Sequence, residues 1–165
     1  MNIDNHVYDA LIILIKISEN AQETSQESLK CLSTFEWIKE YCTVRASTAR
    51  RGGHTTAILK LMEDNEMHIG CVFQNYRMTR MFQDFYNQRN CDRGKLEFCI
   101  SKEELRSNKL AGRTFKKLDA LVIDNSFFYS KKDEDKMYQL ACLLGHTEYR
   151  TYGNTNRKFF IIFLQ

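Results

Sequence analysis

Three short, almost continuously apolar runs constrain the fold of this chain more than any other feature. They are Ile69–Gln74 (IGCVFQ), Leu118–Ile123 (LDALVI) and Lys158–Leu164 (KFFIIFL). A strand that is apolar on both faces needs cover on both faces, as in parallel sheets flanked by helices. Segments with apolar residues at helical spacing lie between these runs, so strands and helices alternate along the chain. The sequence therefore predicts an α/β fold with a mainly parallel sheet.

The rest of the chain supplies further elements. Strands are predicted at Cys42–Ala46 and Lys95–Ile100, and a polar turn at Glu19–Glu27. Ser101 suits the N-cap of a helix, and Gly145 suits a helix C-terminus. Apolar spacing predicts helices at Gln26–Tyr41, Thr55–Met62, Met78–Asn87 and Lys132–Leu144. The apolar run Val7–Ile17 fits a buried helix, and its shortness also allows a strand.

Length and composition favour one domain. The chain has 165 residues, of which 43% are apolar and none is proline. We expect a single domain over 1–165, with helices in 1–42 and the sheet-containing core in 43–165. The longest aliphatic run, Ala10–Ile15, is too short to span a bilayer, so no membrane association is expected. Six cysteines without CxxC spacing fit free thiols in the cytoplasm.

Charge is unevenly distributed along the chain. Met1–Glu40 carries a net charge of −4, whereas Tyr76–Lys117 has eleven basic and five acidic residues, a net charge of +6. The basic segment predicts a surface for DNA or RNA, with Arg77, Arg80 and Arg89 as the contacts. In the same segment, aromatic residues alternate with these arginines and either stack on bases or face the core. These aromatic residues are Tyr76, Phe82, Phe85 and Tyr86.

The stretch Thr48–Thr56 matches part of the phosphate-binding pattern GxxxxGK[ST]. Gly53 occupies the second glycine position and Thr55 the hydroxyl position, and a helix is predicted directly afterwards. Thr48 replaces the first glycine, and His54 replaces the lysine. Such a loop offers backbone amides, a helix N-terminus and a cation to phosphate groups. A glycine pair is also common in simple turns, so a purely structural interpretation stays open.

From this loop onward the chain resembles viral (phage) packaging-terminase and helicase-type P-loop ATPases. The segments that carry the resemblance are ARRGGHTTAIL, GCVFQNYRMTRMF, AGRTFKKLDALVIDNSFF and RTYGNTNRKFFIIFL, within Ala46 to the C-terminus. The resemblance implies a P-loop fold that binds ATP or another nucleotide with Mg2+ in the cytoplasm, which is the host's if the protein is viral. It implies that Thr55 and Asp124 hold the metal. It also implies phosphate contacts from Arg50, Arg51, Gly52, Gly53, His54, Thr55 and Thr56.

Two departures from the family pattern weaken the expectation of catalysis. His54 is shorter than lysine, and histidine is largely uncharged near neutral pH. Arg50 or Arg51 could supply part of the missing charge. Asn125 stands where the family places a glutamate that activates water. The other histidines, His6, His68 and His146, have no evident partner.

These residues leave three functions open. The first is phosphate or nucleotide binding with weak or no ATP hydrolysis. The second is an inactive P-loop scaffold, a pseudoenzyme, that binds and regulates another protein. The third is a DNA- or RNA-binding accessory protein that uses the basic segment 76–117. An efficient enzyme is not expected, because both His54 and Asn125 depart from the family pattern.

Overall fold

The protein is built around one parallel sheet. A computed structural model describes residues 3–25, 31–47, 53–89, 94–110, 113, 115, 117–125, 129–151 and 158–165. Five parallel strands form the sheet in the order β1-β5-β4-β2-β3. They are β1 (Thr43–Ala46), β2 (His68–Phe73), β3 (Lys95–Ser101), β4 (Ala120–Ile123) and β5 (Phe160–Leu164). The predicted α/β fold with a mainly parallel sheet is confirmed.

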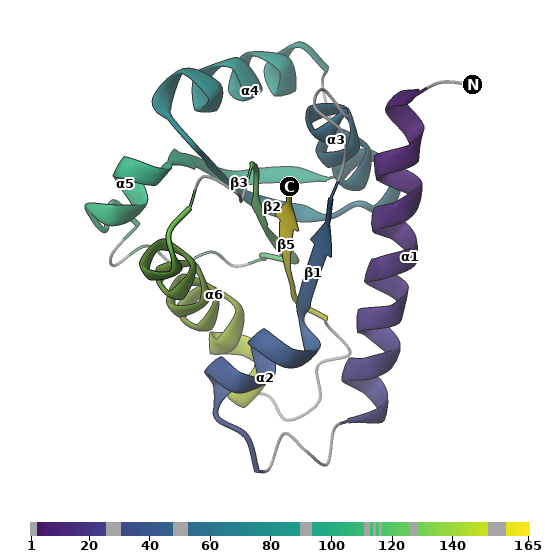
Figure 1. Cartoon of the computed structure of the whole chain (residues 1–165), viewed down its shortest axis with the longest axis vertical. Helices are drawn as coiled ribbons and strands as arrows, with labels where there is room; N and C mark the ends of the chain where they lie inside the picture. The colour runs from purple at the N-terminus through teal and green to yellow at the C-terminus, as the bar shows by residue number, and fades with distance from the viewer. Residues whose placement is uncertain are drawn as a thin grey trace.

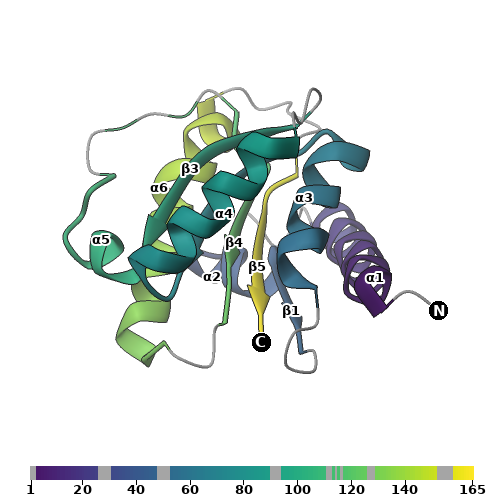
Figure 2. The ribbon, with the colours of Figure 1, turned by 90° about the horizontal axis from the view of Figure 1, so that it is seen from above.

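Helices cover both faces of this sheet. Within the described part of the chain they are α1 (Ile3–Thr24), α2 (Thr34–Tyr41), α3 (His54–Asn65), α4 (Tyr76–Arg89), α5 (Lys102–Arg106) and α6 (Lys131–Thr151). Figure 1 shows α1 along one side of the sheet and α2 with α6 on the other. The view from above in Figure 2 places α3 beside α1. None of the described helices has the length and apolarity needed to cross a bilayer.

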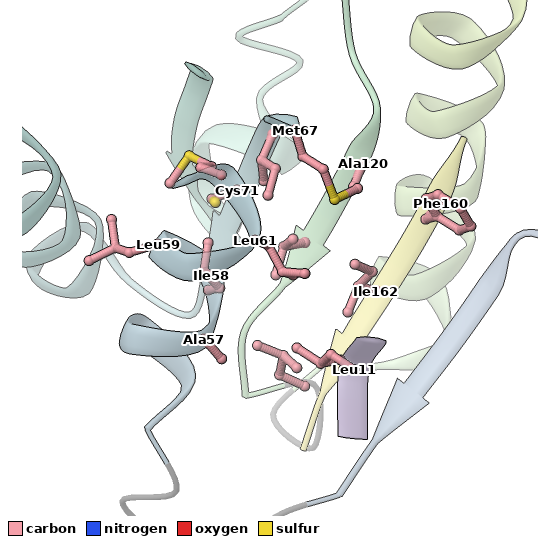
Figure 3. Close-up of a cluster of buried hydrophobic side chains, with 14 of the residues drawn as sticks. Leu11, Ala57, Ile58, Leu59, Leu61, Met67, Cys71, Ala120, Phe160 and Ile162 are labelled. Carbon is pink, nitrogen blue, oxygen red and sulfur yellow. The ribbon is translucent and has the colours of Figure 1, made fainter. Parts of the chain in front are cut away.

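Alternate residues of each strand point into two separate cores, which explains the continuous apolar runs. In β4, Val122 points into the core under α1, α3 and α4, whereas Leu121 points into the core under α2, α5 and α6. Figure 3 shows Ala57, Ile58 and Leu61 of α3 in the first of these cores. All residues of β4 and β5 are buried, so each strand contributes to both cores along its whole length.

Helix boundaries differ from the predicted ones where polar residues find buried partners. The predicted turn at Glu19–Glu27 is wrong over residues 19–24, because α1 continues to Thr24, and residues 26 and 27 lie outside the described residues. Ser18 donates to the carbonyl of Tyr41 at 2.6 Å, and buried Gln22 donates to the carbonyl of Phe159 at 3.2 Å. These bonds let a polar stretch remain helical against the body of the protein.

Two other helix predictions also need correction. The helix predicted over Gln26–Tyr41 begins only at Thr34, where Ser33 and Glu36 form a capping box. Residues 26–30 lie outside the described residues. Gly145 does not end α6, which continues to Thr151. A glycine inside a helix costs only about 1 kcal/mol, which the rest of the helix can offset.

Candidate functional site

The carboxyl ends of the strands meet at one edge of the sheet, because all five strands are parallel. At this edge His54 begins α3, shortly after β1, and Asp124 directly follows β4. The imidazole Nδ1 of His54 lies 2.7 Å from Oδ1 of Asp124. Only 16% of the His54 side chain and 6% of the Asp124 side chain are exposed. The fold therefore brings together two residues that stand 70 positions apart in the sequence.

Local backbone geometry fixes both ends of this contact. Gly53, the residue before α3, has a φ of 78°, a left-handed conformation that glycine adopts without strain. Its carbonyl accepts the first bond of the helix, from the amide of Ala57 at 2.9 Å. The amide of Asp124 donates to the carbonyl of Val72 at 3.0 Å, which ties this residue to β2. Asn125 then turns the chain with a φ of 52°.

Both carboxylate oxygens of Asp124 accept hydrogen bonds. Oδ1 is bound by His54, and Oδ2 accepts from the side-chain amide of Asn125 at 2.6 Å. Because an ionised carboxylate only accepts, Nδ1 of His54 carries a proton in this contact. Asn125, the residue in place of the expected glutamate, thus helps to hold Asp124 in position.

Within the described residues, each oxygen of Asp124 has one hydrogen-bond donor and one further lone pair. Magnesium needs oxygen ligands with free lone pairs in near-octahedral geometry. The described residues contain no cluster of three or more His, Cys, Asp or Glu side chains placed to hold a metal. The metal role expected for Thr55 and Asp124 is not tested by these contacts and stays a prediction.

Four helices begin at this edge, and α3 differs from the others in its cap. Asn75, Ser101 and Ser130 stand before α4, α5 and α6, and each side chain accepts a hydrogen bond from the amide three residues later. Gly53 has no side chain that could do the same for α3. The start of α3 therefore has no built-in side-chain cap at its N-cap position.

The other residues predicted from the loop fall into two groups. Arg50, Arg51 and Gly52 lie outside the described residues. Thr55 and Thr56 occupy the first turn of α3 and are half-buried, beside His54. The phosphate-binding prediction for these residues is untested by their positions alone.

The predicted nucleic-acid contacts lie on α4. Arg77, Arg80 and Arg89 are all exposed there. The guanidinium of Arg80 lies 6.0 Å from the ring centroid of Tyr76, and Nη1 of Arg89 lies 3.9 Å from a carboxylate oxygen of Glu63. The three arginines do not reach the contact between His54 and Asp124 through any described hydrogen bond.

Tyr129 is a neighbour of the site that the sequence did not reveal. Its hydroxyl is buried and has no hydrogen-bond partner among the described residues. Burial raises the pKa of this hydroxyl well above its ordinary value, and the negative charge of Asp124 raises it further. The only sequence signal was an aromatic run soon after the apolar strand, at residues 127–129.

A second histidine–carboxylate contact lies at the opposite edge of the sheet. Nδ1 of His68 lies 2.7 Å from Oε1 of Glu97, where β2 and β3 begin. The side chain of His68 is 18% exposed, which is close to the value for His54. The expectation that His68 has no partner is therefore wrong, and the two contacts form a natural comparison.

Two cavities lie away from His54 and Asp124. One, of about 420 Å³, lies between α5 and α6 and is mostly apolar, with Leu105, Leu140 and Leu143 among its lining residues. The other, of about 510 Å³, opens between α1 and the amino-terminal edge of the sheet, with Glu19, Lys117 and Lys158 among its lining residues. The candidate site at the carboxyl edge belongs to neither cavity.

Comparison with known proteins adds no relative to this description. A scan against protein-family models finds no match to the chain, and a search of curated proteins finds no significant similarity. The resemblance to P-loop ATPases stays a hypothesis that rests on this chain's own residues.

Proposed function

We propose that this protein binds phosphate groups of a nucleotide at the carboxyl edge of its sheet, beside the start of α3, with weak or no hydrolysis. The observation that carries the proposal is the contact of His54 with Asp124 at 2.7 Å. A phosphate loop requires this meeting of the loop helix with the acid after an apolar strand, whereas a simple turn does not. Ligand sites of parallel α/β sheets also lie at this edge.

The start of α3 supplies the attraction for an anion. A helix N-terminus carries about half a positive charge, and its first amides point outward along the axis. The glycine at the N-cap has no side chain to bind the first amides of α3, whereas the neighbouring helices have a serine or asparagine side chain there. Thr55 and Thr56, in the same turn, add hydroxyl groups that can donate to phosphate.

His54 has a different role from the lysine that it replaces. Its imidazole contacts Asp124, so it satisfies one oxygen of a buried carboxylate close to the anion site. In a phosphate loop with lysine, the ammonium contacts the phosphates directly. We therefore propose that phosphate binding here does not depend on magnesium, since an imidazole already occupies the position beside Asp124.

The same residues argue against efficient hydrolysis. Asn125 has an amide, which cannot take a proton from water, and this amide is bound to Asp124. Phosphoryl transfer needs a positioned water and strong neutralisation of the developing charge. Neither is provided by the described residues of this edge.

Titration calorimetry with tripolyphosphate and with ATP, each in EDTA and in Mg2+, tests the proposal. We expect both ligands to bind in EDTA, and Mg2+ to change the affinity less than about tenfold. His54→Ala should weaken binding by on the order of tenfold, because it leaves a buried carboxylate oxygen near the anion without its hydrogen bond. His68→Ala is the matched control, since it removes an equivalent contact at the other edge and should leave affinity unchanged.

Two results would overturn the proposal. One is an absence of tripolyphosphate binding in both buffers at millimolar concentration. The other is an equal effect of His54→Ala and His68→Ala, which would mean that the loop helix has no special relation to the ligand. Circular dichroism spectra of both variants should match the parent, so that loss of binding reports on the site.

A further inference from the structure

The outer face of α4 combines exposed aromatic rings with arginines. Tyr76 is 58% exposed and Phe85 is 49% exposed, although large apolar side chains are usually buried. Phe82, in contrast, is buried in the core, and the hydroxyl of Tyr86 accepts a hydrogen bond from the amide of Leu96. The structure thus divides the aromatic residues of this helix into an inward pair and an outward pair.

The outward pair lies on a positively charged helix. The exposed face of α4 carries Arg77, Arg80 and Arg89, against a single acidic residue, Asp84. Arg80 donates from Nη1 to the hydroxyl of Tyr76 at 3.4 Å, which holds its guanidinium beside the ring. Figure 1 shows α4 at the top of the molecule, with the sheet below it.

We propose that a single-stranded nucleic acid crosses the exposed side of α4. Its bases stack on Tyr76 and Phe85, which stand about two and a half turns apart on opposite flanks of that side, and Arg77 and Arg80 between them neutralise its phosphates. Single-strand binding surfaces combine aromatic rings, on which any base can stack, with a positively charged path for the backbone. A protein-docking helix face would need apolar contact area, whereas here each exposed ring has an arginine within one helical turn.

The charge of α4 favours nucleic acid as the ligand. The helix α4 itself carries three arginines and one aspartate, a net charge of +2, which favours a polyanion. Duplex DNA would not present its bases to a ring on the surface of a helix, because its bases are paired and stacked on each other. A flexible single strand leaves the faces of its bases available. This inference does not rest on the proposed phosphate site, because it is argued from the side chains of α4 alone.

Fluorescence anisotropy with a labelled 12-residue oligo(dT) and its oligo(U) counterpart, between 50 and 200 mM salt, measures this binding. The double variant Tyr76→Ala/Phe85→Ala should weaken binding by on the order of tenfold for each ring, with the salt slope unchanged. Arg77→Ala/Arg80→Ala should reduce the slope of log K against log salt by about 1.4, since each single-strand phosphate contact contributes about 0.7.

Matched controls remove similar side chains elsewhere. Ile13→Ala/Ile17→Ala removes two exposed apolar side chains of α1. Lys16→Ala/Lys39→Ala removes two exposed cations of α1 and α2. Both controls should bind as the parent does. Thermal unfolding of every variant should follow the parent, because all the changed residues are exposed.

Three outcomes would overturn the inference. The parent could fail to bind either oligonucleotide at 50 mM salt, or the two α4 variants could bind no differently from their controls. In the third outcome, His54→Ala abolishes oligonucleotide binding while the α4 variants retain it. That result would place the strand at the start of α3, and so would contradict this inference while supporting the proposed phosphate site.

Discussion

Asp124 shows how the length of a neighbouring side chain decides what a carboxylate contacts. With lysine at position 54, the cation would extend toward phosphate and leave the aspartate available to a metal. With histidine, the shorter side chain ends at the aspartate itself, 2.7 Å from Oδ1. Asn125 completes the arrangement on the other oxygen. The carboxylate then acts as an anchor for the start of α3.

The direction in which Asp124→Asn changes the binding affinity shows whether Asp124 is an anchor or a metal ligand. If Asp124 is an anchor, removing its negative charge should strengthen tripolyphosphate binding in EDTA by several fold, since like charges repel. If Asp124 holds magnesium, the same change should instead weaken ATP binding in Mg2+. Asp119→Asn changes the acid at the other end of β4 and serves as the control. Calorimetry in both buffers measures the difference, and a loss of affinity confined to Mg2+ would contradict the anchor role.

At the scale of elements, the start of α6 is fixed by a charged pair that links it to α5. Asp133 is buried and caps the helix through Ser130, while Arg106 donates to both carboxylate oxygens at 2.7 and 2.8 Å. The hydrogen bonds from Arg106 hold the pKa of the Asp133 carboxyl well below its ordinary value. Arg106 itself is half-exposed, so its role is to satisfy a carboxylate that is almost fully buried.

Acid should therefore weaken the contact between Arg106 and Asp133 and lower the stability of the fold. A carboxyl whose pKa is lower in the folded state contributes stability that is present above its unfolded pKa, near 3.9, and is lost as pH falls further. We expect Asp133→Asn to cost about 1–3 kcal/mol at pH 7 and progressively less below pH 4. Asp9→Asn, at an exposed position, should cost little at any pH. Urea unfolding at a series of pH values measures both, and an equal cost of Asp133→Asn at pH 7 and pH 2.5 would contradict this explanation.

The sequence predicted some element boundaries and not others, for identifiable reasons. Ser101 was recognisable as a cap because a serine followed three residues later by glutamate is a local signal, and the capping box is present. The end of α1 was not recognisable, because Gln22 is a polar residue. Its burial depends on a hydrogen bond to the carbonyl of Phe159, which stands 137 positions away in the sequence. Similarly, the contact of His68 with Glu97 depends on the pairing of β2 with β3.

For the whole molecule, the alternating strands and helices predicted the parallel sheet. The sequence placed Thr55 and Asp124 at one site, and the structure brings His54, the residue before Thr55, to Asp124. The chemistry of that approach could not be predicted. Spacing alone indicates that a loop and an acid meet, whereas their hydrogen bonds depend on side-chain length and on Asn125. Which aromatic residues of α4 face outward also required the structure, because four rings within eleven residues fit more than one helical face.

The two cores lie on opposite faces of one sheet and share its strands, so the whole chain should unfold in one step. Trp37, the only tryptophan, is buried in the core under α2, α5 and α6. Ile58 is buried in the other core, under α1 and α3. Ile58→Ala should destabilise the protein by about 2–5 kcal/mol, as expected when a large buried side chain is truncated.

If unfolding is cooperative, Trp37 fluorescence should report this loss in full, although its ring does not contact the mutated core. The urea midpoint followed by fluorescence should shift together with the midpoint followed by circular dichroism. Ile13→Ala, at an exposed position of α1, should leave both midpoints close to the parent. If the fluorescence transition stayed in place while the dichroism transition shifted, the two cores would unfold separately. The core that contains Ile58 would then be lost at a lower urea concentration than the core that contains Trp37.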